Sequence, residues 1–202
     1  MHLAKTAPLD PAKLTASDRA LWSRFPADFR RFYAKQNGGF CAEDEAVELT
    51  IPMTWSMGGK SRKRQKNSLE ELWRFDRRKL AKGPRSILLE HFGRHLAEAF
   101  LPRDVVVFGN CVQSCLVAIS LAAHDLGNVY YWEWYWQYPW YKEFFLKRVE
   151  RAVKRFDTKH QDLEGRTMSD AHTTGDAANY ATLVKVADSF SAFVKGLRKS
   201  ED

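Results

Sequence analysis

Three short apolar segments that follow one another closely constrain the fold most strongly. Residues 104–108, 115–121 and 128–134 are rich in β-branched and aromatic side chains. Gly109-Asn110 separates the first two segments, and a turn over residues 125–128 separates the last two. Strands joined by such short turns pair antiparallel, because a parallel return needs a long crossover. The sequence therefore predicts antiparallel neighbours in this part of the chain.

Patterns elsewhere predict further elements around these strands. Val47, Leu49 and Ile51 alternate with polar residues, which indicates a strand with one buried face. Thr15 or Ser17 can cap a first helix, and Pro26 suits the start of a second helix that ends before Gly38-Gly39. We expect further helices over residues 68–82, 86–100, 139–156 and 176–197, and loops over residues 52–67 and 158–175.

Length and composition limit the class of protein. A chain of 202 residues with 45% hydrophobic residues is long enough to bury a core of its own. The longest apolar run, residues 115–123, is far shorter than the roughly 20 residues of a membrane-spanning helix. The first residues lack the apolar stretch of a secretory signal, and three cysteines are an odd number. We therefore expect a folded protein of the cytoplasm.

Positive charge is concentrated in one segment. The chain carries a formal net charge of +7, and residues 60–85 hold eleven Lys or Arg against three acidic residues. Contacts between such cations and phosphates supply affinity for nucleic acid that is independent of base sequence. The other interpretation is a solvated loop. The candidate anion-binding residues are Lys60, Arg62, Lys63, Arg64 and Lys66.

The densest feature is an aromatic stretch, residues 130–141, with nine aromatic side chains in twelve positions. On a strand, alternate rings point to opposite faces, so one set can fill the core while the other packs under a helix or lies exposed. Exposed Trp and Tyr are common anchors in protein interfaces. Core packing on one face and a partner-binding surface on the other both remain open. The candidate anchors are Trp134, Tyr135, Trp136, Tyr138 and Trp140.

Motifs for catalysis or metal binding are weak in this sequence. His91 and His95 are four residues apart, but Phe92 stands where a zinc protease motif needs Glu. Three residues separate Cys111 from Cys115, instead of the two of a redox or zinc pair, so buried hydrophobic roles are favoured. No nucleophile elbow, phosphate loop or dinucleotide fingerprint is present. We expect no enzymatic activity, no metal and no cofactor.

Three stretches, taken in order, resemble a known family. Residues 25–39 (FPADFRRFYAKQNGG) resemble the opening helix and Asn-Gly turn of the SUKH superfamily, the Smi/Knr-like domains. Residues 127–132 (GNVYYW) resemble its late strand, and residues 186–197 (VADSFSAFVKGL) resemble its closing helix. The resemblance implies a single α+β domain, an antiparallel sheet packed by helices, over residues 15–198. Residues 1–14 are then expected to form a flexible N-terminal arm.

The same resemblance implies a non-enzymatic role. Many bacterial members are immunity proteins that bind and block a toxin, and fungal relatives regulate cell-wall synthesis or act as scaffolds. We therefore expect a protein-binding domain whose partner is a toxin. Nucleic-acid binding through residues 60–85 and a regulatory scaffold are the alternatives.

Overall fold

The structure is a computed structural model, and it describes residues 6–41, 47–52, 65–77, 85–88, 101–102, 104–112, 115–132 and 183–199. The helices and strands, in chain order, are η1 (Pro11–Lys13), α1 (Ala16–Arg24), α2 (Ala27–Tyr33), β1 (Gly39–Phe40), β2 (Val47–Ile51), β3 (Gln65–Leu72), β4 (Val105–Cys111), β5 (Cys115–Ser120), β6 (Val129–Trp132), β7 (Leu183–Ala187), α6 (Phe190–Gly196) and β8 (Arg198–Lys199). None of the described helices is long and apolar enough to cross a bilayer.

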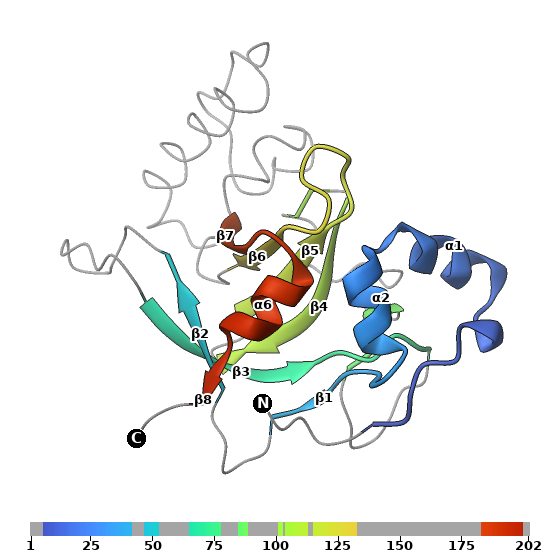
Figure 1. The fold of residues 1–202 in the computed structure, drawn as a ribbon, viewed down its shortest axis with the longest axis horizontal. Helices are drawn as coiled ribbons and strands as arrows, with labels where there is room; N and C mark the ends of the chain where they lie inside the picture. Colours follow the sequence, from blue (N-terminus) through green and yellow to red (C-terminus); the bar gives the residue numbers. More distant parts are fainter. Residues whose placement is uncertain are drawn as a thin grey trace, which may run out of the picture.

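The strands form one antiparallel sheet in the order β7-β6-β5-β4-β3-β2-β8, and β1 pairs with β3 next to β2. The sheet curves so strongly around α6 that β2 and β7, which belong to opposite ends of this order, approach each other (Figure 1). Helices α2 and α6 contact each other in front of the sheet (Figure 1). The predicted α+β class with an antiparallel sheet is confirmed.

Aromatic rings join the helices to the sheet. Phe29 of α2 lies 4.9 Å from Phe190 of α6 and 5.9 Å from Phe108 of β4, measured between ring centroids. Phe193 of α6 meets Phe108 at 5.5 Å, and most of these contacts are edge to face, a geometry that aromatic pairs favour. Phe29 and Tyr33 stand four residues apart on α2 and are fully buried, so the helical spacing of the sequence places both rings in the core.

The central strands are buried on both faces. Every residue of β4, β5 and β6 is buried. Because successive side chains of a strand point to opposite sides, both faces of this part of the sheet are covered. The near-continuous apolar runs that predicted these strands are typical of strands in such a position.

The N-terminal part of the chain packs beside α2. Thr15 caps α1 by accepting a hydrogen bond from the Asp18 N–H, and Pro26 precedes the first residue of α2, as the sequence predicts. Within the expected arm, Leu9 is buried and its N–H donates to the Tyr33 carbonyl. Residues 6–14 therefore contact the domain, and the division of the chain at residue 14 stays a prediction.

The predicted helix over residues 68–82 is wrong in its first part, and the predicted loop over residues 52–67 ends too late. Residues 65–72 form strand β3, which pairs with β2 on one side and with β4 on the other. The sequence Ser68-Leu-Glu-Glu71 has the form of a capping box, which predicts the helix and would stabilise its start by about 1 kcal/mol. The two ladders and the burial of Leu69 and Leu72 outweigh that local preference.

The predicted last helix is also too long. Residues 183–187 form strand β7, which pairs with β6, and the helix begins only at Phe190. Ser189 sets this start, because its hydroxyl accepts a hydrogen bond from the Ala192 N–H at 3.0 Å. The alternating valines of Leu183–Ala187 suit a strand, although their apolar spacing also fits a helix.

Several predicted elements lie outside the described residues. They are most of the helix over residues 86–100, the helix over residues 139–156 and the loop over residues 158–175.

Candidate partner-binding site

The part of the aromatic stretch that lies in strand β6 belongs to the core. Tyr130, Tyr131 and Trp132 are all buried, although successive rings point to opposite faces. The rings within β6 therefore present no surface to a partner. The predicted anchors Trp134, Tyr135, Trp136, Tyr138 and Trp140 follow directly after β6 and lie outside the described residues, so their role stays a prediction.

The basic run, residues 60–66, leads into strand β3 from the connection that follows β2. β2 and β3 are antiparallel, and their last paired residues are Ile51 and Gln65. Residues 52–64 therefore join these two strands at one end of the sheet. Lys66 lies on β3, where its Nζ is 2.5 Å from Glu48 Oε2. The other predicted anion-binding residues, Lys60, Arg62, Lys63 and Arg64, lie outside the described residues.

Each cation of segment 60–85 that the structure describes is bound to a carboxylate. The pairs are Lys66–Glu48, Arg74–Asp76, Arg77–Asp18 and Arg85–Glu71. A cation held by a carboxylate of its own chain offers less to a phosphate, because the negative charge of the carboxylate offsets the positive charge of the cation. Part of the basic segment therefore stabilises the fold, which the charge pattern of the sequence does not reveal.

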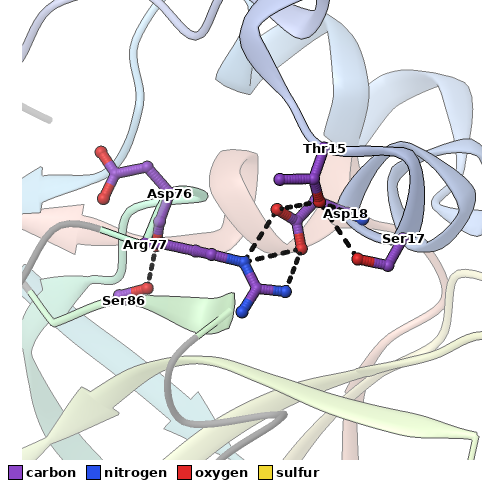
Figure 2. Close-up of polar contacts among 6 residues, drawn as sticks. All are labelled: Thr15, Ser17, Asp18, Asp76, Arg77 and Ser86. Atoms are coloured by element: carbon purple, nitrogen blue, oxygen red, sulfur yellow. Dashed lines mark hydrogen bonds and ion pairs between the residues drawn. The ribbon is translucent and has the colours of Figure 1, made fainter.

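The pair between Arg77 and Asp18 ties helix α1 to the segment after β3 (Figure 2). The guanidinium donates to Asp18 Oδ2 from Nε at 2.9 Å and to Oδ1 from Nη2 at 2.6 Å. The Thr15 hydroxyl donates to Oδ2 at 2.7 Å. Asp18 is almost fully buried, and the hydrogen bond from Arg77 lowers the pKa of its carboxyl against the opposing effect of burial.

A second buried carboxylate, Glu71, belongs to a polar network between β3 and β4. Trp73 Nε1 donates to Glu71 Oε1 at 3.1 Å and to Asn110 Oδ1 at 2.9 Å. The Arg85 N–H donates to Glu71 Oε2 at 3.2 Å, and the Arg85 guanidinium lies 5.8 Å from the centre of the Trp73 ring. Burial raises the pKa of Glu71 despite these donors. The network fixes the side chains where β3 and β4 pair.

One hydrogen bond joins the start of β3 to the end of β6. Asn67 Nδ2 donates to the Tyr131 hydroxyl at 2.7 Å, although β4 and β5 lie between these strands in the sheet. Only a strongly curved sheet brings the two side chains together. The basic run ends just before Asn67, and the predicted anchors begin just after Tyr131. The strand ends that lead into these two regions, the start of β3 and the end of β6, therefore lie at the same end of the sheet.

The cysteines behave as buried hydrophobic residues, as expected. Cys111 and Cys115 are buried, are not disulfide-bonded and lie directly opposite each other in β4 and β5. Burial raises the pKa of Cys111, and it raises the pKa of the half-buried Cys41 to about 11, so both thiols stay protonated at neutral pH. Within the described residues, no group of three or more His, Cys, Asp or Glu side chains could hold a metal. His91 and His95 lie outside them.

Comparison with known proteins identifies the family. No curated protein and no solved structure matches the chain. The model of the SMI1/KNR4 family (SUKH-1) matches residues 8–154, which is more than half of the chain. The match includes α1, α2, the strands β1 to β6 and the aromatic stretch. The resemblance found in the sequence is confirmed, and the chain belongs to the SMI1/KNR4 family (SUKH-1).

Proposed function

We propose that the protein is an immunity protein that binds and neutralises a toxin. Domains of this family generally bind protein partners and are generally non-enzymatic. The observation that supports the proposal is the position of the β6 end, where the Asn67–Tyr131 bond holds the start of the aromatic stretch beside the first residues of β3. Trp and Tyr side chains that leave a rigid strand are well suited to anchor a partner, because little conformational entropy is lost on binding.

The ion pairs of segment 60–85 favour a protein partner over nucleic acid. Binding to nucleic acid draws on cations that are free to displace counterions from phosphates. Lys66, Arg74, Arg77 and Arg85 each bind a carboxylate of this chain. The positive charge available for a phosphate backbone is therefore smaller than the sequence suggests.

A pull-down from the native cells at low and high salt tests the proposal. We expect one stoichiometric protein that stays bound at high salt, to be identified by mass spectrometry. We also expect that coexpression of the chain relieves the growth defect which that protein causes. Nucleic acid that is washed off as salt rises would contradict the proposal, as would a captured protein that is harmless to the cell.

The anchors are tested with the double variant Trp136→Ala/Trp140→Ala. Each anchor of this kind contributes about 2 kcal/mol or more, so we expect binding of the captured protein to be lost while circular dichroism and the melting temperature stay unchanged. Phe40→Ala is the matched control, because Phe40 is an exposed aromatic residue of β1. Unchanged affinity of the double variant would refute the assignment of the anchors.

A further inference from the structure

Every carboxylate in the described part of the chain has a partner within the chain. Most of them bind a Lys or Arg side chain, in the pairs Lys13–Asp10, Arg24–Asp104, Lys66–Glu48, Arg74–Asp76, Arg77–Asp18, Arg85–Glu71 and Lys185–Asp188. The others accept hydrogen bonds: Asp28 from the Ser191 N–H, Glu70 from Asn110 and Asp125 from the Tyr130 hydroxyl. The positive charge that no carboxylate offsets therefore lies on cations outside these pairs.

Most of the unpaired cations lie on or next to helix α2. Among the Lys and Arg residues whose side chains the structure describes, those that make neither an ion pair nor a hydrogen bond through the side chain are Arg30, Arg31, Lys35 and Lys195. Arg30 and Arg31 belong to α2, and Lys35 lies in the turn that follows it. A cation without a carboxylate beside it keeps its full attraction for an anion. This part of the chain is therefore better suited to bind an anion than the described cations of segment 60–85.

The helical spacing of α2 places these cations on its outward side. Phe29 and Tyr33 are fully buried in the core. At 3.6 residues per turn, the side opposite to these two rings carries Ala27, Arg30, Arg31 and Ala34. Asp28, the acidic residue of α2, is turned toward α6, because its carboxylate accepts a hydrogen bond from the Ser191 N–H at 2.7 Å. The outward side of α2 therefore carries positive charge that no acidic residue of the helix offsets.

The outward side of α2 is accessible. Ala27, Arg31, Ala34 and Lys35 are exposed, and Arg30 is half-buried. We call these five residues the α2 face.

Arg30 is held in place by packing. Its Nε atom is buried and has no hydrogen-bond partner in the described part of the chain, although the residue as a whole is only half-buried. The stem of the side chain therefore packs against the protein, while the outer end of the guanidinium reaches the surface. An Arg side chain binds a carboxylate through two parallel hydrogen bonds. Because packing already restricts Arg30, less conformational entropy is lost when it binds.

The dimensions of the α2 face favour an acidic protein segment over nucleic acid. α2 has seven residues, so it is about 10 Å long. Nucleic acids gain affinity from extended tracks of cations that each neutralise a phosphate. Three cations within so short a distance match a few carboxylates of a protein. The small side chains of Ala27 and Ala34 also let a polypeptide approach the helix closely.

We infer that the α2 face is a docking surface for an acidic segment of the partner protein, in which Arg30 and Arg31 bind carboxylates and Lys35 adds positive charge. The inference rests on the proposed protein-binding function and names the chemistry of the partner. Cations in the last turn of a helix also stabilise the helix itself. The test therefore has to separate binding from stability.

The test is a titration of the full isotope-labelled chain at low salt with a short peptide in which Glu and Ala alternate. A peptide with Gln in place of Glu is the charge control, and a single-stranded RNA of equal charge is the nucleic-acid control. We expect the acidic peptide to shift the amide resonances of Arg30, Arg31 and Lys35 most, and to bind about tenfold tighter than the Gln peptide. Raising the salt should remove most of this difference.

Two variants with the same change in net charge localise the binding. Arg30→Gln/Arg31→Gln removes two unpaired cations from the α2 face. Lys13→Gln/Arg24→Gln removes two cations that are ion-paired at the surface. We expect the first variant to bind the acidic peptide about fivefold more weakly, and the second to bind within about twofold of wild type.

A third variant keeps the packed Arg30 side chain. Arg31→Gln/Lys35→Gln changes only exposed residues, so its circular dichroism and melting temperature should match those of wild type. We expect it to bind the acidic peptide about fivefold more weakly as well. It decides the question if Arg30→Gln/Arg31→Gln folds poorly.

Three outcomes would overturn the inference. They are resonance shifts that cluster away from α2, equal weakening by the α2 variants and by Lys13→Gln/Arg24→Gln, and tighter binding of the RNA at the same residues. The peptide titration gives its answer whether or not the pull-down finds a toxin. A toxin captured in the pull-down that binds Arg31→Gln/Lys35→Gln normally would refute this surface and leave the proposed function intact.

Discussion

The carboxyl groups of Asp18 and Glu71 are both buried, but their surroundings shift their pKa values in opposite directions. Asp18 accepts hydrogen bonds from Arg77 and Thr15, and its pKa is lowered. Glu71 also has donors around it, but burial dominates and its pKa is raised. By linkage, ionised Asp18 stabilises the fold, whereas the ionisation of Glu71 costs stability. The two residues therefore give opposite responses to pH.

Asp18→Asn should destabilise the protein by about 1–3 kcal/mol. Breaking a buried ion pair costs about 3–5 kcal/mol, and the cost is lower here because Arg77 is partly exposed and can be hydrated. The measurement is urea unfolding at neutral pH. Asp188→Asn is the control, since its pair with Lys185 is exposed and should change stability by less than about 0.5 kcal/mol. Equal stabilities of the two variants would show that the Arg77 pair is not structural.

Glu71→Gln should change how stability depends on pH. Because the folded pKa of Glu71 lies above its unfolded value, its contribution is present at low pH and is lost as pH rises through the folded pKa. The Gln side chain keeps an acceptor for Trp73 and does not ionise. The stability of wild type minus that of the variant should therefore fall as pH rises above about 4, the ordinary pKa of a Glu carboxyl. A difference that stays constant over this range in urea unfolding would contradict the raised pKa.

Among the helices and strands, those that depend on signals within one segment are predicted from the sequence. The strands that depend on pairing with a distant segment are not. Helices α1 and α2 and strands β2, β4, β5 and β6 follow from caps and apolar spacing within each segment. The predicted turn at Gly109-Asn110 is wrong, because both residues lie within β4 and pair with β5.

β3 and β7 overlap predicted helices. The Leu and Val spacing of β7 fits both periods. Leu69 and Leu72 of β3 are three residues apart, as in a helix; the pairing of β3 with β4 shifts register between Leu69 and Glu71, and both Leu side chains are buried. The spacing therefore does not identify either segment as a strand instead of a helix. Only the ladders with β2, β4 and β6 decide between the two, and these partners are distant in the sequence.

Gly109→Ala tests the close packing of β3 against β4. A Cβ at Gly109 would lie 2.6 Å from the Glu71 carbonyl oxygen and 3.0 Å from Val117 Cγ2, so the strands would have to move. We expect a loss of about 2 kcal/mol or more in the free energy of unfolding. In Gly196→Ala, the control, the new Cβ meets nothing within 4 Å, so stability should stay equal or rise by up to about 1 kcal/mol. Similar effects of both changes on thermal unfolding would refute the tight contact.

In the molecule as a whole, the curvature of the sheet brings together side chains of strands that are not neighbours in the strand order. β3 and β6 are separated by two strands, yet Asn67 bonds to Tyr131. Asn67 and Tyr131 lie far apart in the chain, and their hydrogen bond depends on the bend of a sheet whose strand β3 is not predicted from the sequence. The sequence alone therefore gives no reason to place the start of β3 beside the end of β6.

A double-mutant cycle measures this contact. Tyr131→Phe removes the hydroxyl and should cost about 1 kcal/mol, and we expect a coupling of about 1 kcal/mol with Asn67→Ala. The control cycle pairs Asn67→Ala with Tyr130→Phe, since the Tyr130 hydroxyl donates to Asp125 instead. That coupling should be close to zero. If the first cycle also gives no coupling, the two strands are not joined through Asn67.

The end of the sheet where β2 and β6 finish has a consequence for how such a protein can diversify. The chain between Ile51 and Gln65 and the chain between Trp132 and Leu183 both leave the sheet there, while the aromatic core lies between the sheet and helices α2 and α6. Changing the length of a connection between two strands costs little free energy, because closure entropy grows only slowly with loop length. Sequence changes in these two connections can therefore alter what the protein binds without altering the residues of its core.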